Sequence, residues 1–171
     1  RRKNAEHLLS QSEAQYRLLF NYSPIPMWIY DVETHAFLDV NDAASRQYGY
    51  SKEEFLSMTI KQIRPQEDVH ILEQTLQRMK QYSESYHKGV YRHQRKDGTI
   101  IHVRIESNTI FLNGRKAEII LALDITAEVQ DEEHIKRKNR LINATNTFIS
   151  QLLEVDEWTE AIDRSFTVIG Q

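Results

Sequence analysis

The chain has 171 residues and a formal net charge of −3 at pH 7, with 22 Lys and Arg against 25 Asp and Glu. This length allows one domain with appendages or two small domains. The near-neutral charge excludes the basic footprint of a nucleic-acid-binding protein. The longest apolar run covers only residues 119–123, which excludes a membrane-spanning helix of roughly 18–20 residues.

The chain contains no cysteine and does not begin with Met. The absence of cysteine excludes disulfides, thiolate metal sites and cysteine nucleophiles, and it is compatible with the reducing cytoplasm, where we expect the protein to lie. The chain starts at Arg1 and stops at Gln171 within a helical pattern. We therefore expect it to be a piece of a longer protein.

In chain order, the first predicted element is a helix over residues 5–20, where apolar residues recur at helical spacing. Pro24 and Pro26 end this pattern because proline fixes φ and lacks an amide donor. Two short strands are expected next, at residues 27–31 and 36–41, on either side of a polar turn.

Two short helices and one longer helix are predicted after these strands. The first covers residues 42–48, and the second begins at Ser51, whose spacing to Glu54 is that of a capping box. The longer helix covers residues 65–82, with Pro65 in its first turn. Its apolar stripe follows the helical period and consists of Val69, Leu72, Leu76 and Met79.

From residue 86 onward the apolar period changes from helical to two, which predicts strands. Turn signals at Asp97-Gly98 and Asn113-Gly114 divide this stretch into three strands of an antiparallel meander.

Two details of the meander depend on its register. A two-residue turn at Asp97-Gly98 would place His93 directly opposite His102. The alternation becomes irregular after Ile105, and a bulge near residues 107–108 would account for the irregularity.

A long polar helix is predicted from residue 127 onward, with an interruption near residues 154–156. Two progressions of apolar residues with a seven-residue period run along it, which is the pattern of a coiled coil or a helix bundle. One consists of Ile135, Ile142 and Ile149, and the other of Leu141, Phe148 and Val155. We therefore expect this helix to project from the domain and to pack against a partner.

The predicted order is thus a helix, two strands, short helices, a longer helix, three strands and a final helix. This order predicts an α+β fold with a five-stranded antiparallel sheet that carries helices on one face.

Four sequence landmarks in this order resemble the PAS family of sensory domains over about residues 12–126. Residues 41–44 and 48–55 resemble the family's N-x-A and GYS-x-EEL segments. Residues 95–98 resemble its RKDG turn, and residues 124–126 resemble the DIT motif that closes the last strand and opens the output helix. The helix start after Arg64 is a looser match to the family's HP-x-D segment, because Arg replaces the His.

The resemblance implies a PAS fold with an N-terminal flanking helix over residues 1–22 and the PAS domain over residues 23–126. A linker or coiled-coil helix over residues 127–155 is the implied signalling helix. Residues 156–171 resemble the truncated start of a GAF domain, a match that rests only on an amphipathic helix.

The resemblance also implies a function in signal transduction. We expect a sensory or relay module of a multidomain protein, with a sensor histidine kinase of a two-component phosphorelay as the first expectation. The alternative is a ligand-free dimerisation or spacer domain in a cyclic-di-nucleotide enzyme or a transcription regulator. The expected partners are a second copy of the chain, bound through the N- and C-terminal helices, the adjacent domains of the parent protein, and a small-molecule ligand.

PAS domains hold ligands between the sheet and the helices, and several residues of this chain are candidates to contact one there. They are Trp28, Tyr30, Asn41, Leu72, Leu76, Ile101, Val103, Leu121 and Leu123. A domain of about 115 residues needs this much apolar filling, so all of them except Asn41 also fit a closed core. Asn41 also fits a helix cap.

The cofactor stays unknown. The family's covalent flavin adducts and thioester-linked chromophores require Cys, which this chain lacks, whereas a non-covalent flavin remains open. His70 lies on the helix that carries the iron ligand in heme-binding PAS domains, but beside the apolar stripe, so we expect no heme. His93 and His102 would share their face with two arginines, so we expect no metal site there.

No catalytic constellation is visible, because the chain lacks a phosphate-binding glycine loop, an HExxH pair and a GxSxG elbow. We therefore expect no enzymatic activity in this chain. His134 lacks the flanking residues of a histidine-kinase phospho-acceptor and fits a solvated charged face. The expected signal junction is Asp124, Ile125 and Thr126, where a shift of the last strand would move the next helix, with Asp124 paired to a basic residue.

Overall fold

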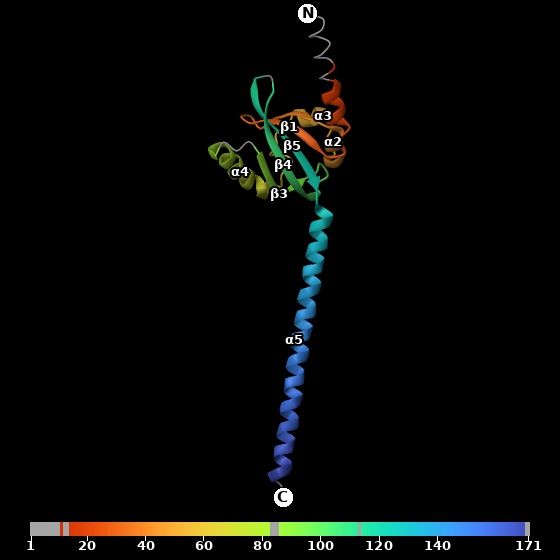
Figure 1. The fold of residues 1–171 in the computed structure, drawn as a ribbon, viewed down its shortest axis with the longest axis vertical. Helices are drawn as coiled ribbons and strands as arrows, with labels where there is room; N and C mark the ends of the chain where they lie inside the picture. Colours follow the sequence, from red (N-terminus) through yellow and green to blue (C-terminus); the bar gives the residue numbers. More distant parts are fainter. Residues whose placement is uncertain (1–10, 12–13, 83–85, 113, 170–171) are drawn as a thin grey trace, which may run out of the picture. The chain divides into compact units, whose positions relative to one another are not determined.

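The computed structural model describes residues 11, 14–82, 86–112 and 114–169, with the side chains of these ranges except those of residues 82 and 152–169. The elements follow in the order β1 (Met27–Asp31), β2 (Phe37–Val40), α2 (Asp42–Tyr48), α3 (Lys52–Leu56), η1 (Gln66–Asp68), α4 (Val69–Tyr82), β3 (Tyr86–Gln94), β4 (Ile100–Leu112), β5 (Arg115–Asp124) and α5 (Thr126–Ile169) (Figure 1). A helical segment over residues 14–21 precedes β1. Of the flanking helix predicted over residues 1–22, residues 1–10, 12 and 13 lie outside the described residues.

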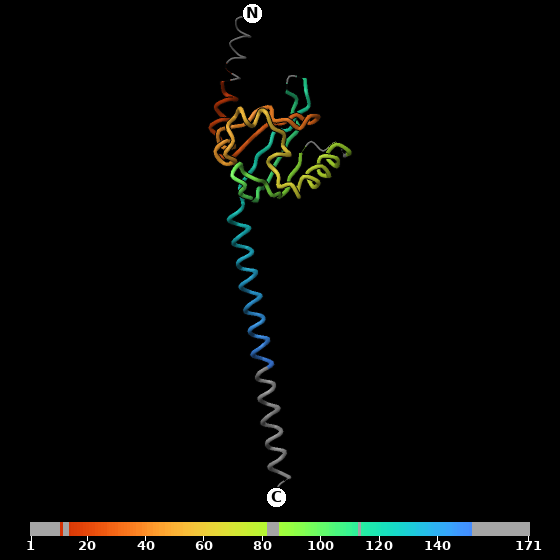
Figure 2. The backbone as a smooth tube through the Cα atoms, turned by 180° about the vertical axis from the view of Figure 1, so that it is seen from behind, coloured from red at the N-terminus to blue at the C-terminus, as the bar shows by residue number. Residues whose placement is uncertain are grey.

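The five strands form one antiparallel sheet in the order β2-β1-β5-β4-β3. The strands β3, β4 and β5 pair consecutively as the predicted meander, and β5 pairs with β1 at the centre of the sheet. The helices α2, α3 and α4 pack on one face of this sheet (Figures 1 and 2). The predicted α+β fold is therefore confirmed.

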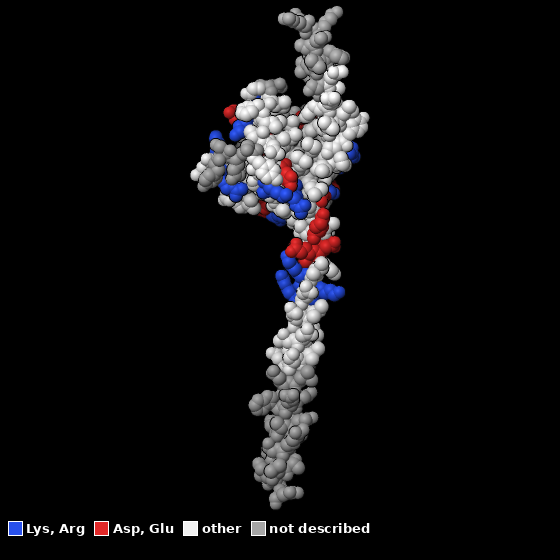
Figure 3. All heavy atoms as spheres, in the orientation of Figure 1, with Lys and Arg blue, Asp and Glu red and all other residues white. Residues whose placement is uncertain are grey.

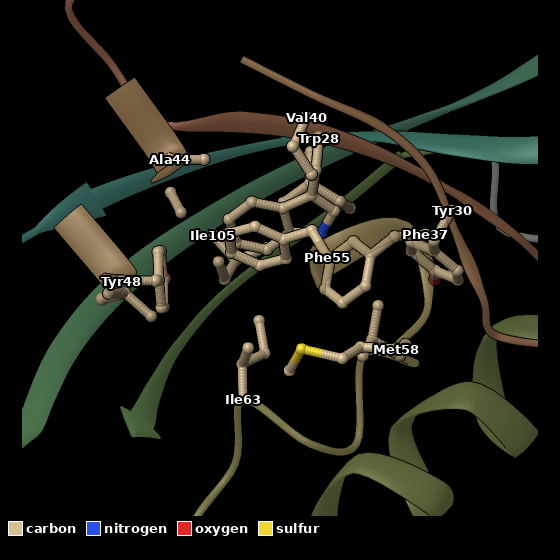
Figure 4. Packing of buried hydrophobic residues seen from close by; sticks show 14 of the residues in the cluster. Trp28, Tyr30, Phe37, Val40, Ala44, Tyr48, Phe55, Met58, Ile63 and Ile105 are labelled. Atoms are coloured by element: carbon tan, nitrogen blue, oxygen red, sulfur yellow. The ribbon is translucent and has the colours of Figure 1, made fainter. Parts of the chain in front are cut away.

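The core on the helix-covered face is centred on Trp28 of β1 (Figure 4). Its ring meets the ring of Phe37 edge-on at a centroid distance of 6.1 Å and that of Tyr48 at 5.7 Å. Phe55 of α3 extends the cluster, with its ring centroid 5.0 Å from that of Phe37. Each such pair contributes about 0.5–1.5 kcal/mol beyond the area that it buries. The rings therefore hold the two short helices against the sheet.

The opposite face of the sheet carries a second, smaller apolar cluster. It contains Phe20 from the N-terminal helical segment, Ile29 from β1 and Ala117 from β5, with Ile110 of β4 packed against them. Both faces of the central strands are therefore covered, which explains their nearly continuous apolar sequences.

The two apolar faces also explain the irregular alternation in β4. Ser107 continues the buried, helix-facing side of the strand after Ile105, whereas Ile110 packs on the opposite face. The pairing of β4 with both neighbours runs through Ser107 and Asn108 without a shift. The predicted bulge is therefore wrong.

The turn between β3 and β4 has three residues, not two. The Arg95 N–H donates to the Thr99 carbonyl at 2.9 Å, the Gly98 N–H donates to the Arg95 carbonyl at 3.0 Å, and Gly98 has a φ of 87°. These features define a type I turn followed by a left-handed residue. His93 consequently pairs with Ile101, and His102 lies on the other face. The predicted juxtaposition of the two histidines is wrong.

The predicted end of the first short helix and the predicted start of the second agree with the structure, whereas the predicted start of the longer helix does not. The Ser51–Glu54 capping box forms, and Gly49 ends α2 with a φ of 79°. The longer helix begins as the single 3-10 turn η1 and becomes α-helical only at Val69, so Pro65 precedes its first turn.

The helix α5 belongs to a separate unit of residues 127–171. It continues without a break through residues 154–156, so the predicted interruption is wrong.

Every side chain of α5 from Gln130 to Gln151 is exposed. Acidic residues near the start of the helix precede basic ones (Figure 3), and the Glu132 carboxylate lies 2.6 Å from the Lys136 ammonium group. Among the described residues, no helix is both long and apolar enough to cross a membrane.

Candidate functional site

A cavity of about 40 Å³ lies between the helix-covered face of the sheet and the segment that contains η1 and α4. One water molecule requires roughly 10–15 Å³ of such volume, so the cavity admits a molecule of a few non-hydrogen atoms. Its apolar wall consists of Trp28, Ile60, Ile63, Leu72, Leu76, Met79, Ile105 and Ile120.

Polar side chains complete the wall of this cavity. The Nε2 atom of His87 lies 2.6 Å from the hydroxyl oxygen of Tyr91. Ser107 is 2% exposed, and its hydroxyl has no hydrogen-bond partner among the described residues. The remaining polar lining residues are Tyr30, Arg64 and Thr75.

Arg64 is the charged residue of the cavity wall. Its Nε is enclosed without a hydrogen-bond partner among the described residues, and its guanidinium carbon lies 4.8 Å from the centroid of the Tyr91 ring. The adjacent Ile63 carbonyl accepts from the Gln94 N–H at 2.9 Å, which ties this loop to β3. Burial lowers the pKa of Arg64 to about 10. The guanidinium is therefore still charged at neutral pH.

An open groove of about 740 Å³ adjoins the cavity and shares Tyr30, Leu76 and Met79 with it. Glu118 in the groove wall is 3% exposed, and burial raises the pKa of its carboxyl group. The Thr109 hydroxyl donates to its Oε1 at 2.6 Å, whereas its Oε2 has no partner within the described part of the chain.

Four of the sequence-predicted candidates line this cavity, namely Trp28, Tyr30, Leu72 and Leu76. Ile101 and Val103 belong to the same core cluster but not to the cavity wall.

Leu121 and Leu123 lie on the opposite face of the sheet. Leu121 pairs with Met27 of the second cluster, whereas the neighbouring Ile120 pairs with Trp28 and reaches the cavity. Because β5 is apolar on both faces, its alternation does not indicate which face the helices cover.

Asn41 is completely buried and serves as the N-cap of α2. Its Oδ1 accepts from the Ala44 N–H at 2.9 Å and from the Met27 N–H at 3.0 Å. Its Nδ2 donates to the carbonyls of Phe20 at 3.0 Å and Ile25 at 2.9 Å. The predicted cap is confirmed, and Asn41 also joins the N-terminal segment to β1 and α2.

Five polar residues of the cavity were not predicted from the sequence, namely Arg64, Thr75, His87, Tyr91 and Ser107. Ser107 follows Ile105 at the strand period, so it could have been placed on the inner face. His87 and Tyr91 share one face of β3 at the same period. Arg64 stands out in the sequence only as the departure from the HP-x-D segment.

The residues of the expected signal junction form a compact hydrogen-bond network between β4, β5 and the start of α5. The Oδ1 of Asp124 accepts from the Thr126 N–H at 3.0 Å and from the Thr126 hydroxyl at 2.6 Å. The His102 N–H donates to the Thr126 hydroxyl at 2.9 Å, and the Ile125 N–H donates to the His102 carbonyl at 2.8 Å. The expected basic partner of Asp124 is Arg95, whose Nη2 lies 3.1 Å from its Oδ2.

Comparisons with known proteins agree with this architecture. The family model described as PAS domain matches residues 24–127. The chain is 26% identical over 173 aligned residues to the Methyl sulfide methyltransferase-associated sensor of Methanosarcina acetivorans. This alignment covers 97% of this chain and 17% of the relative.

Solved structures show the same fold. The PAS domain of an HTR-like protein from Haloarcula marismortui is 22% identical to this chain, with a TM-score of 0.61. The superposition covers 72% of this chain and 99% of that domain. A domain of a sensory box sensor histidine kinase/response regulator from Geobacter sulfurreducens is 26% identical to this chain, with a TM-score of 0.54. The superposition covers 67% of this chain and 95% of that domain.

The chain spans only 17% of the length of its curated relative. Nothing in these comparisons indicates the GAF domain expected over residues 156–171, because the family match ends at residue 127. The matched part is a sensor domain that resembles those of sensor histidine kinases and other signalling proteins. The chain belongs to the PAS domain family.

Proposed function

We propose that the chain is a cytoplasmic sensory relay module of a multidomain sensor histidine kinase in a two-component phosphorelay. It binds a small molecule in the cavity and transmits the resulting change through β4 and β5 into α5. The similarity to a domain of a sensor histidine kinase and to a curated sensor supports this assignment. The kinase chemistry belongs to other domains of the parent protein.

The observation that carries the proposal is that two strands serve both the cavity and the junction. β4 contributes Ile105 and Ser107 to the cavity, and the backbone of its His102 bonds the start of α5. β5 contributes Ile120 to the cavity and ends at Asp124, which bonds Thr126. A displacement of either strand therefore acts directly on the first residue of α5.

The mechanism requires two arrangements of the junction with different affinities for the ligand, because a ligand shifts an equilibrium only by its differential affinity. Occupation of the cavity moves β4 relative to β5 and changes the geometry around the Thr126 hydroxyl. The first turn of α5 then changes its orientation or its stability. Such small shifts become switches where the packing has two discrete states.

The test fills the cavity with a side chain and measures amide hydrogen exchange at the junction. Ser107→Leu places an alkyl group in the cavity, whereas Asn108→Leu adds the same group at the exposed neighbouring position. We expect Ser107→Leu to change exchange of the amides over residues 124–130 several-fold and Asn108→Leu to leave them unchanged. Thr75→Leu, from the α4 side of the cavity, provides a second filling variant if Ser107→Leu fails to fold. Unchanged exchange in a folded filling variant would contradict the proposal.

A ligand-free dimerisation or spacer domain is the second candidate, and the exposed apolar stripe of α5 favours it. Ile135, Ile142 and Ile149 are 58%, 47% and 47% exposed. Native mass spectrometry with a visible absorption spectrum of the purified chain separates the two candidates. Extra mass supports a sensor, and a clean apo dimer supports the spacer. A GAF domain that starts within residues 156–171 stays a prediction.

A further inference from the structure

Arg64 is a cavity-lining cation that lacks an anionic partner within the described part of the chain. Asp68 acts on it electrostatically, but both carboxylate oxygens of Asp68 bind Arg92, with Nε to Oδ2 at 2.8 Å and Nη2 to Oδ1 at 2.6 Å. The Arg64 guanidinium lies over the ring of Tyr91, which attracts a cation but accepts no conventional hydrogen bond at its face.

A half-buried guanidinium whose Nε is enclosed without a hydrogen-bond partner among the described residues favours the binding of an anion. The group carries five N–H donors and no acceptor, and a buried charge is costly unless it is paired and hydrogen-bonded. An oxyanion supplies both the opposite charge and the planar pair of acceptors that a guanidinium matches.

The rest of the cavity restricts the size and the polarity of that anion. With about 40 Å³ of space, the cavity admits only a few non-hydrogen atoms. Its wall is largely apolar, with Leu72, Leu76 and Ile120 among its residues, so the ligand must also carry a hydrocarbon part. The Ser107 hydroxyl, which interacts with the neighbouring Glu118 carboxyl group, is a second polar group of the cavity wall.

We propose that the cavity binds a short-chain monocarboxylate, such as acetate or propionate, whose carboxylate pairs with Arg64 and whose alkyl group contacts the apolar wall. The proposal rests on the proposed function, because it names the ligand class of the same cavity. Inorganic anions lack the alkyl group and short alcohols lack the charge, so both should bind more weakly.

The first experiment uses the unmodified 171-residue chain. Thermal unfolding and isothermal titration calorimetry compare sodium propionate with propan-1-ol and with sodium chloride at equal concentrations. We expect propionate to raise the melting temperature and to bind at a one-to-one ratio, because a ligand specific for the folded state stabilises it. Propan-1-ol and chloride should give at most a small fraction of this shift.

The second experiment assigns the charge to Arg64. Arg64→Met keeps the length of the side chain and removes the charge, and Arg78→Met removes a charge from the exposed surface of α4 as a matched control. We expect Arg64→Met to weaken propionate binding by at least about 30-fold and Arg78→Met to leave it unchanged. In the unmodified chain, addition of propionate should shift the NMR signal of the Arg64 Nε–H. This measurement does not depend on whether a variant folds.

The outcomes separate this inference from the proposed function. If propan-1-ol or chloride binds as well as propionate, the monocarboxylate class is wrong. If propionate does not bind, but cavity-filling substitution still alters exchange at the junction, the ligand class fails and the relay stands. If both experiments are negative, both proposals fail. Binding that survives in Arg64→Met also overturns the inference.

Discussion

Tyr48 and His93 form a buried polar pair inside the aromatic core. The hydroxyl oxygen of Tyr48 lies 2.7 Å from Nδ1 of His93, and both residues are completely buried. Burial raises the pKa of Tyr48, and burial together with the nearby charge of Arg64 lowers the pKa of His93 well below its usual range. Both rings are therefore neutral at pH 7. The hydrogen bond between them gives the Tyr48 hydroxyl and the His93 Nδ1 atom the partner that a buried polar group requires.

The lowered pKa of His93 predicts a loss of stability in mild acid. As the pH falls below about 6.5, the unfolded chain binds a proton at His93, whereas the folded protein does not, so the free energy of unfolding decreases. Between pH 7.5 and 5.5, this one group should remove about 1.4 kcal/mol. Urea denaturation of the wild type and of His93→Gln at the two pH values measures the effect.

The difference between the wild type and His93→Gln excludes the contributions of the other histidines. Burial also lowers the pKa of His35, but this contribution is common to both proteins and cancels in the difference. We expect His93→Gln to lose less stability than the wild type over this range, although its stability at pH 7.5 is lower. Equal losses in both proteins would show that His93 does not titrate in this way.

At the scale of the elements, the turn between β3 and β4 shows how a local sequence decides a register. The Asp97 Oδ1 accepts from the Thr99 N–H at 2.9 Å, and Gly98 takes the left-handed conformation. This three-residue turn shifts the pairing by one residue relative to a two-residue turn. A one-residue shift moves every side chain of one strand to the other face, so the turn determines that His93 enters the core.

The left-handed conformation predicts a specific cost for substitution of Gly98. A Cβ atom at this position would meet no other atom within 4 Å, so the cost of Gly98→Ala is conformational, about 1–2 kcal/mol of unfolding free energy. Gly98→Asn should lose clearly less, because Asn adopts this conformation more readily. Urea denaturation of the three proteins measures both values. Equal stability of the Ala and Gly proteins would contradict the assigned turn.

At the scale of the whole molecule, α5 presents apolar side chains that nothing in the described part of the chain covers. Leu141 and Phe148 are 63% and 61% exposed, beside the isoleucines of the neighbouring progression. A seven-residue period of this kind is buried when two helices pack as a coiled coil. We therefore expect a homodimer through α5.

A lysine in the stripe tests the expected dimer. Ile142→Lys places a charge at the centre of the apolar stripe, whereas Asn143→Lys adds the same charge beside it. Sedimentation velocity should show a dimer for the wild type and for Asn143→Lys, and a dissociation constant at least about tenfold higher for Ile142→Lys. A wild-type monomer, or equal dissociation of the two variants, would contradict this assembly.

The sequence alone determined the elements whose causes lie within a few residues of each other. The capping box at Ser51, the end of the first short helix at residue 48 and the two-residue period of the strands were all predicted, because caps, turns and apolar periods are local. The order of these elements, with the PAS landmarks, was sufficient for the fold. Asn41 was predicted as a cap for the same reason.

Only the tertiary structure decided which side chains meet. Ile120 rather than Leu121 reaches the cavity because β5 is apolar on both faces and only the packing of the helices distinguishes them. The lack of an anionic partner for Arg64 likewise depends on Asp68 being held by Arg92, from a strand more than twenty residues away in the chain. A sequence pattern specifies local conformation, whereas burial and charge compensation depend on which distant segments come into contact.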